Sequence, residues 1–140
     1  EYIDYLVDQK VDGYFSTNDR VDQVSHAEYG KLMSRSKIAL NFSHSVTGHQ
    51  LKGRIFDAML SGAMLLESEN DQITQLFTPM KDYVPFSSKE DMLNKIRYYL
   101  SNQKEAVAIA EQGQLTAIKN YNSNRFWRLF LNKLELIDML

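Results

Sequence analysis

The sequence predicts a single α/β domain: a parallel sheet whose strands are joined by crossover helices, followed by extra helices near the C-terminal end. Two short apolar runs, residues 37–42 and 63–66, have the length and composition of strands buried on both faces. Between them, residues 50–61 carry apolar side chains at helical spacing. Three more helical patterns follow the last predicted strand. Strands that alternate with helices are typical of a parallel sheet.

The N-terminal quarter predicts two helices separated by a β segment. Apolar residues recur at helical spacing over residues 1–9, so we expect a helix there. Residues 11–16 predict a short β segment, because Tyr14 and Phe15 favour a sheet. Ser25, followed three residues later by Glu28, forms a capping box that predicts the start of the next helix.

The middle of the chain predicts a helix, a buried strand, a short helix and a final β segment. The buried face of helix 50–61 is expected to consist of Ile55, Phe56, Met59 and Leu60. Gly62 is placed to end this helix at its C′ position. Residues 73–77 predict a short helix and residues 82–86 a β segment. Pro85 there indicates a strand end or an edge strand.

The C-terminal third predicts three helices. Ser88 with Asp91 should cap the first. The second, at residues 103–119, contains Gly113, which should weaken it by about 1 kcal/mol relative to alanine. Its candidates for burial are Val107, Ala110, Leu115 and Ile118. The last begins near residue 124, and its aromatic residues, Phe126 and Trp127 among them, are expected to pack on the sheet or on a neighbouring domain.

Composition limits the possible functions. The 140 residues suit one domain, and the net charge of −2 argues against bulk attraction to nucleic acid, for which the chain also lacks a basic stripe. No apolar run approaches the roughly 20 residues of a transmembrane helix. The absence of cysteine suits a reducing compartment, so we expect a cytoplasmic location. Because the chain begins abruptly at Glu1 within a helical pattern, we expect residues 1–140 to be a fragment of a longer protein.

A polar loop after the first predicted strand carries the most informative residues. Lys52 and Arg54 flank Gly53 at the predicted start of a helix, and ligands of parallel α/β sheets bind at the carboxyl ends of the strands. Cations and free N–H groups at a helix N-terminus suit phosphate, and glycine lets a ligand approach the backbone. The alternative is that both basic side chains are simply solvated.

Further polar residues are expected near the same edge of the sheet. Asp57 could accept hydrogen bonds from vicinal hydroxyls of a ribose, or form an ion pair with Arg54 at helical spacing. His44 and His49 could donate to ligand oxygens or be ordinary polar residues. The histidines lack metal-site spacing, and no GxSxG nucleophile motif is present. Glu67 and Ser68 follow the next strand, where they could hold a sugar or phosphate or be ordinary loop residues.

Three segments together resemble a known family. The segments are residues 36–42 (Ser-Lys-Ile-Ala-Leu-Asn-Phe), 51–58 (Leu-Lys-Gly-Arg-Ile-Phe-Asp-Ala) and 62–67 (Gly-Ala-Met-Leu-Leu-Glu). In this order and spacing they resemble the C-terminal domain of GT-B glycosyltransferases, and most of all the spore-maturation-protein-like group. The resemblance covers roughly residues 25–130. It implies a Rossmann-like half of a GT-B fold that binds a nucleotide-diphosphate sugar.

The resemblance also implies roles for particular residues. Lys52 and Arg54 would face the diphosphate. Asp57 would take the place of the family's ribose-binding glutamate, and Glu67 and Ser68 would lie near the donor. His49 stands where related retaining enzymes carry a glutamate, so the stereochemical course is not implied. Such enzymes generally need no cofactor and no essential metal. The acceptor would be held by an N-terminal domain that residues 1–140 do not include, so this chain alone should be inactive.

A non-catalytic α/β module that binds a nucleotide or a protein is the alternative. It could be a degenerate glycosyltransferase domain or a receiver-like domain. A phosphoreceiver needs an acidic cluster at its strand ends, whereas the first predicted strand here ends in Asn41-Phe42-Ser43. An effect of Arg54 on nucleotide affinity would separate a functional donor site from a degenerate one.

Overall fold

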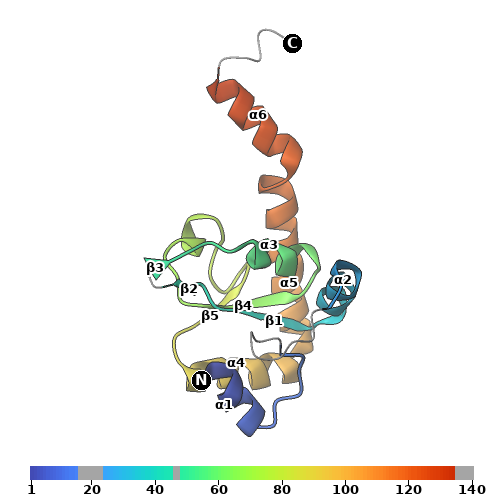
Figure 1. The fold of residues 1–140 in the computed structure, drawn as a ribbon, viewed down its shortest axis with the longest axis vertical. Coiled ribbons are helices and arrows are strands. Elements are labelled where there is room, and N and C mark those ends of the chain that lie inside the picture. Colours follow the sequence, from blue (N-terminus) through green and yellow to red (C-terminus); the bar gives the residue numbers. More distant parts are fainter. Residues whose placement is uncertain (16–23, 46–47, 135–140) are drawn as a thin grey trace.

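The computed structural model describes residues 1–15, 24–45 and 48–134, and its centre is a three-stranded parallel sheet (Figure 1). The strand order is β1 (Ile38–Asn41), β4 (Met64–Ser68), β5 (Val84–Phe86). The central strand β4 pairs with β1 from Ile38 opposite Met64 and with β5 from Leu66 opposite Val84. The predicted parallel α/β architecture is therefore confirmed, and it is consistent with a Rossmann-like half fold.

Helices cover both faces of this sheet. Helices α1 (Tyr2–Asp8) and α4 (Lys89–Ser101) lie on one face and α3 (Gly53–Leu60) on the other, as Figure 1 shows. Side chains of β4 alternate between them: Met64 and Leu66 pack with α1 and α4, and Leu65 packs with α3. All three are at most 1% exposed, as expected of a central strand with two covered faces.

The remaining elements lie around this core. Helix α2 (His26–Arg35) precedes β1, and a short antiparallel hairpin of β2 (His44–Ser45) and β3 (Gly48–His49) follows it. A 3-10 turn, η1 (Ile73–Gln75), precedes β5. Helix α5 (Gln103–Asn120) contributes to both hydrophobic clusters, and α6 (Ser123–Lys133) extends from its end away from the sheet (Figure 1). No described helix is both long and apolar enough to cross a lipid bilayer.

The local signals at helix ends are confirmed. Ser25 accepts a hydrogen bond from the Glu28 amide, and the Glu28 carboxylate accepts one from the Ser25 amide, which completes the capping box. Ser88 caps α4 by accepting from the Asp91 amide. Gly62 follows α3 with a φ of 80°, the left-handed conformation that glycine adopts without strain. These signals are local, so the sequence alone could specify them.

Predictions about tertiary packing were less successful. No strand forms over residues 11–15, where Phe15 packs on the core from an irregular segment, and Ser16 lies outside the described residues. Helix α3 begins at Gly53 rather than residue 50, and Leu60 is 50% exposed. Strand β1 is only half-buried along most of its length because no described strand pairs with its other edge. Edge placement of Pro85 is confirmed, since β5 pairs with β4 alone among the described strands.

The buried face of α5 was predicted wrongly, apart from Ala110. Val107, Leu115 and Ile118 are 51–62% exposed. The buried residues on this helix are instead mostly small: Ala106, Ile109, Ala110, Gly113 and Ala117. Small side chains let α5 approach the strands and loops closely, so its contact face is not its most hydrophobic face.

Gly113 shows how close this approach is. A Cβ atom at this position would lie 2.3 Å from the backbone oxygen of Asp82. The same loop is held by a hydrogen bond of 2.9 Å from the Thr116 hydroxyl to the Asp82 carboxylate, which also accepts from the Thr78 amide at 2.8 Å. Gly113 therefore permits a helix–loop contact, which outweighs its low helix propensity.

Candidate functional site

The ends of β1 and β4 meet at one edge of the sheet, where α3 begins. Parallel strands place their carboxyl ends together, and this edge is the usual ligand site of open α/β sheets. Asn41 is the last residue of β1 and lies opposite Glu67 of β4. By the alternation of the strands, both side chains lie on the α3 face, together with Leu65.

A buried carboxylate forms the base of this edge. Glu67 is 0% exposed, and its Oε2 accepts a hydrogen bond of 2.7 Å from the Asn41 side-chain amide. Its Oε1 accepts a hydrogen bond from the hydroxyl of Ser43, which is also fully buried. The carboxylate thus joins β4 to the last residue of β1 and to the start of the following loop.

Burial raises the pKa of Glu67 above its usual range. Hydrogen bonds from Ser43 and Asn41 oppose this shift, as do the positive charges of Lys52 and Arg54. The sequence placed Glu67 near a ligand. The structure places its side chain beneath the surface at this edge, where it accepts hydrogen bonds from Asn41 and Ser43.

The loop that follows β1 is tied back to this edge by further hydrogen bonds. The Ser43 amide donates to the Ser68 hydroxyl oxygen at 3.1 Å, and the Gln50 amide donates to the Ser43 carbonyl at 3.1 Å. The Lys52 ammonium donates to the Phe42 carbonyl at 2.8 Å. Lys52 is therefore a half-buried residue that holds the loop, and it still carries two N–H donors that this bond does not use.

The N-terminus of α3 opens at the same edge. Lys52 is its N-cap residue, and no side chain caps the helix. A Cβ atom at Gly53 would meet no atom within 4 Å, so the space above this backbone is open. Arg54 is exposed at the following position. Free amides, the positive end of a helix dipole and a guanidinium together suit an anionic ligand.

Asp57 lies one turn further along α3 and has a partner that the sequence did not indicate. The hydroxyl of Tyr29, on α2, donates to Oδ2 of Asp57 at 3.3 Å. Among the described residues no ion pair joins Asp57 to Arg54, so the predicted alternative of an internal salt bridge is not observed. Burial raises the pKa of the Tyr29 hydroxyl, and the neighbouring Asp57 carboxylate raises it further.

Most of the predicted site residues are thus near one another. Lys52, Gly53, Arg54, Glu67 and Ser68 gather where β1 and β4 end, and Asp57 is on the same helix. The backbone of His49 pairs with that of His44 in the β2–β3 hairpin, but both side chains lie outside the described part of the chain. Within the described residues, no three His, Asp or Glu side chains group as metal ligands do.

Sequence reasoning missed three residues of this edge: Asn41, Ser43 and Tyr29. A signal for Asn41 was present, because Asn41 and Glu67 each interrupt the end of an apolar strand, and parallel pairing places such residues side by side. Tyr29 gave no comparable signal, since its contact with Asp57 joins two helices that are 28 residues apart in the chain.

Comparison with known proteins identifies the family of this chain. Residues 8–132 match the family described as "Glycosyl transferase-like", and since this is most of the chain, the protein belongs to that family. Protein O-glucosyltransferase 3 of Rattus norvegicus is 29% identical over 121 residues, which cover 80% of this chain and 22% of the relative. The Mus musculus protein of the same name is 29% identical over 80% of this chain and 23% of its own length. The chain spans about a fifth of these curated relatives.

Proposed function

We propose that this chain is the donor-binding domain of a GT-B glycosyltransferase, of the spore-maturation-protein-like group, and that it binds a nucleotide-diphosphate sugar at the edge formed by β1, β4 and α3. The observation that carries this proposal is the open N-terminus of α3, with Gly53 uncovered and Arg54 exposed beside it. The acceptor would be held by an N-terminal domain of a longer protein. That domain would also supply the base that activates the acceptor.

The chemistry of transfer fits this arrangement. Departure of a nucleoside diphosphate builds negative charge on its phosphates, and preorganised donors lower the barrier if they face that charge. Arg54 would bind the diphosphate with its guanidinium, and Lys52 would use the two donors that Phe42 leaves free. No metal is needed to neutralise the phosphates if these groups do so.

The sugar and ribose would contact the flanking residues. Tyr29 occupies one carboxylate oxygen of Asp57, which leaves the other to accept a ribose hydroxyl. The Ser68 oxygen accepts a hydrogen bond from Ser43, so its own proton remains available to a donor sugar. We place His49 near the same ligand. Glu67 would act indirectly, by orienting Asn41 and Ser43 beneath it.

Calorimetric titration of the 140-residue chain with UDP, GDP and their sugars tests this proposal. UDP-glucose and GDP-glucose belong in the set, because the rat and mouse relatives are named as glucosyltransferases. We expect weak binding of one nucleotide and no turnover without the acceptor domain. Arg54→Ala should weaken binding about 10- to 100-fold, the effect of losing a charge-assisted hydrogen bond of 1.5–3 kcal/mol.

Arg97→Ala is the matched control, since Arg97 is an exposed arginine of α4, on the opposite face of the sheet. It should leave the affinity unchanged. Absence of binding by a folded sample to every nucleotide would contradict the proposal.

A non-catalytic module remains a second candidate, and the internal bonds of the site favour it. Lys52 and Asp57 are each engaged within the protein, as in a domain that no longer uses them for a ligand. In that case, nucleotide affinity should be the same for Arg54→Ala as for the original chain. Equal nucleotide affinity of Arg54→Ala and the original chain would therefore support the non-catalytic module.

A further inference from the structure

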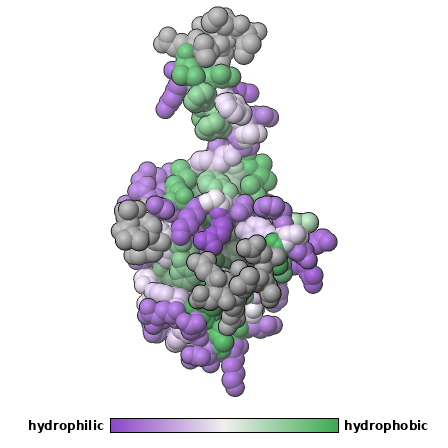
Figure 2. Space-filling view, viewed as in Figure 1, coloured by the Kyte–Doolittle hydropathy of each residue, from purple (hydrophilic) through white to green (hydrophobic). Residues whose placement is uncertain are grey.

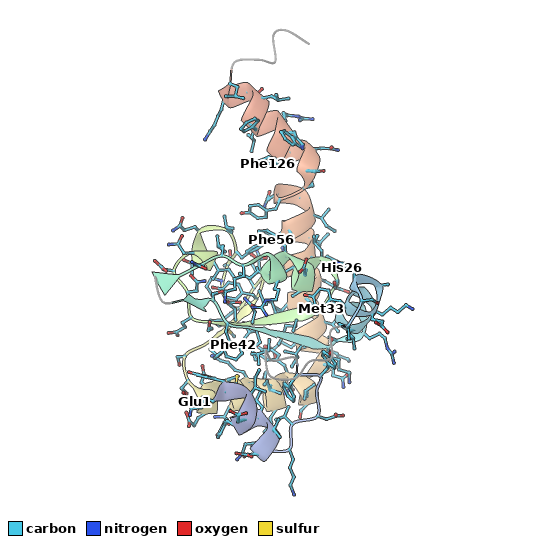
Figure 3. The ribbon with its side chains drawn as sticks, viewed as in Figure 1. Glu1, His26, Met33, Phe42, Phe56 and Phe126 are labelled. Atoms are coloured by element: carbon cyan, nitrogen blue, oxygen red, sulfur yellow. The ribbon has the colours of Figure 1, made fainter. Side chains whose placement is uncertain are left out.

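The carboxyl group of Glu67 is buried at the candidate site, and the proposed chemistry leaves it without a direct role. Its side chain is 0% exposed, and the Asn41 amide and the Ser43 hydroxyl both donate to it. Figure 3 shows Phe42 on the α1 and α4 side of the sheet and Phe56 on the α3 side. Since side chains alternate along an extended chain, the residues on either side of Phe42 lie on the α3 side. The buried carboxyl group and its two partners therefore share the side of the sheet that α3 covers.

Two cations lie close to this carboxyl group. The Lys52 ammonium donates at 2.8 Å to the carbonyl of Phe42, the residue between the two that donate to Glu67. Arg54 is the second residue of α3, and hydrophilic surface is visible over this helix in the space-filling view (Figures 1 and 2). The positive charges of Lys52 and Arg54 both act to lower the pKa of Glu67, against the larger effect of burial, which raises it.

The elements around Glu67 bring few other titratable groups to it, within the described residues. Tyr83, just before β5, is 2% exposed; burial, together with the charges of Glu67 and Glu69, raises its pKa to about 12, so it stays neutral near pH 7. Glu69 itself is exposed, as is Asp57 on α3. The two histidine side chains of the β2–β3 hairpin lie outside the described residues.

We propose that binding of an anion at the N-terminus of α3 is coupled to the uptake of one proton by Glu67. This inference rests on the proposed donor site and makes its affinity depend on pH. In the free protein, the charges of Lys52 and Arg54 favour the ionised carboxylate. A bound diphosphate would neutralise these cations and add negative charge of its own. Both effects favour the neutral carboxylic acid, because electrostatic interactions are stronger in a buried site than in water.

The hydrogen-bond partners of Glu67 can accommodate the added proton, which comes from solvent and binds a carboxylate oxygen. Among the described residues, Oδ1 of Asn41 is the one buried side-chain nitrogen or oxygen atom without a hydrogen-bond partner. If the Asn41 amide turns over, Oδ1 takes the place of the nitrogen that lies 2.7 Å from Oε2 of Glu67, and it can accept the new O–H. The Ser43 oxygen can accept from Oε1 in the same way, because a hydroxyl both donates and accepts. A neutral Glu67 therefore needs no new partner.

The coupling sets how affinity depends on pH. Burial already raises the pKa of Glu67 in the free protein, and a bound anion would raise it further. The complex then binds a proton more tightly than the free protein does, so the anion binds best at low pH. Affinity falls as the pH rises from the pKa of the free form through the higher pKa of the complex, and proton uptake is largest between the two. The total fall should be about 10-fold, the low end of the effect of a neighbouring charge on a carboxyl group.

Calorimetry in buffers with different ionisation enthalpies measures this uptake, because the buffer supplies the protons. UDP-glucose and GDP-glucose are the ligands used, since an esterified diphosphate has no group that titrates near neutral pH. Titrations of the 140-residue chain between pH 5 and pH 8 should show uptake of up to one proton per ligand, together with the fall in affinity. Glu67→Gln should show neither, and circular dichroism checks that it is folded. If it is not, the carboxyl carbon resonance of Glu67 in the original chain, titrated with and without UDP-glucose, measures the same shift.

Glu69→Gln is the matched control, because it removes an exposed carboxyl group two residues away and should keep the proton uptake. Uptake that persists in Glu67→Gln would assign the proton to another group, such as a histidine of the hairpin, and would overturn the proposal. Binding without any proton uptake would also overturn it but would leave the proposed donor site standing.

Sulfate separates the coupling from the identity of the ligand. A folded chain that binds no nucleotide and no nucleotide sugar would contradict the proposed function, and sodium sulfate then tests the coupling by itself. Sulfate should bind with uptake of a proton that Glu67→Gln loses. Sulfate binding without uptake, or no binding of sulfate, would overturn the coupling. The proposed function and the coupling can therefore fail separately.

Discussion

Helices α3 and α6 have similar sequence patterns but different surroundings. Both place apolar residues at helical spacing on one side. In α3 the side chains of Ile55, Ala58 and Met59 are at most 1% exposed against β4 and α5, whereas in α6 Phe126 and Trp127 are more than half exposed. The difference teaches that an amphipathic pattern shows which face of a helix needs cover, but not what covers it.

The largest effect should come from the covered helix. Ile55→Ala removes a fully buried side chain beneath α3 and should lower the free energy of unfolding by about 2–5 kcal/mol, because it leaves a cavity in the core. Urea denaturation followed by circular dichroism measures this change. A loss below about 1 kcal/mol would mean that α3 is held much more loosely than its burial indicates.

The next effect concerns the close approach of α5 to the loop before β5. Gly113→Ala should lower the free energy of unfolding by about 1–3 kcal/mol, since the new methyl group meets the Asp82 backbone oxygen. Gly30→Ala on α2 is the control, because a Cβ atom there meets no atom within 4 Å. That change should instead stabilise the protein by about 0.5–1 kcal/mol through helix propensity. The same sign for both variants would contradict the packing argument.

Glu67 should give the protein a distinct pH dependence. Because its pKa is raised in the folded state, the native protein binds a proton more tightly than the unfolded chain does. The contribution of Glu67 therefore favours folding most at low pH, and it declines as the pH rises from the ordinary glutamate pKa of 4.5 through the higher pKa of the folded state. Glu67→Gln, which keeps the shape of the side chain, should remove this decline.

Urea denaturation of both proteins between pH 4 and pH 8 measures the difference. The free energy of unfolding of Glu67→Gln should increase relative to that of the original chain as the pH rises, because only the original chain loses stability over this range. If the difference in free energy of unfolding between the two proteins did not change with pH, the Glu67 carboxyl group would have the same pKa in the folded and unfolded states, which would contradict this prediction.

The smallest effect should come from the uncovered helix. Phe130→Ala on α6 should change the free energy of unfolding by less than about 0.5 kcal/mol, as is usual for a substitution away from the core. The matched comparison is Ile55→Ala, measured in the same urea series. Similar losses for the two variants would mean that α6 packs on the body and would remove the contrast between the helices.

The candidate site was partly predictable from the order of the chain. Lys52, Gly53 and Arg54 follow a strand and lie at the start of a helix. In a parallel sheet, such residues lie at the edge formed by the carboxyl ends of the strands. Asp57 follows from its place on the same helix. Its bond to Tyr29 was not predictable, because it depends on how α2 packs beside α3. Burial of Glu67 could not be predicted either, since a polar residue at a strand end is usually exposed.

Sequence alone determined the features that depend on neighbours along the chain. These include the apolar strands β1 and β4, the caps at Ser25 and Ser88, and the end of α3 at Gly62. Such features follow from backbone hydrogen bonds and φ angles within a few residues. Tertiary structure decided that α5 buries its small residues, that Glu67 joins two strands from within, and that α6 projects from the body. Each of these features depends on groups that are distant in sequence. Close packing buries the helix face whose shape fits its neighbours, even where another face is more hydrophobic.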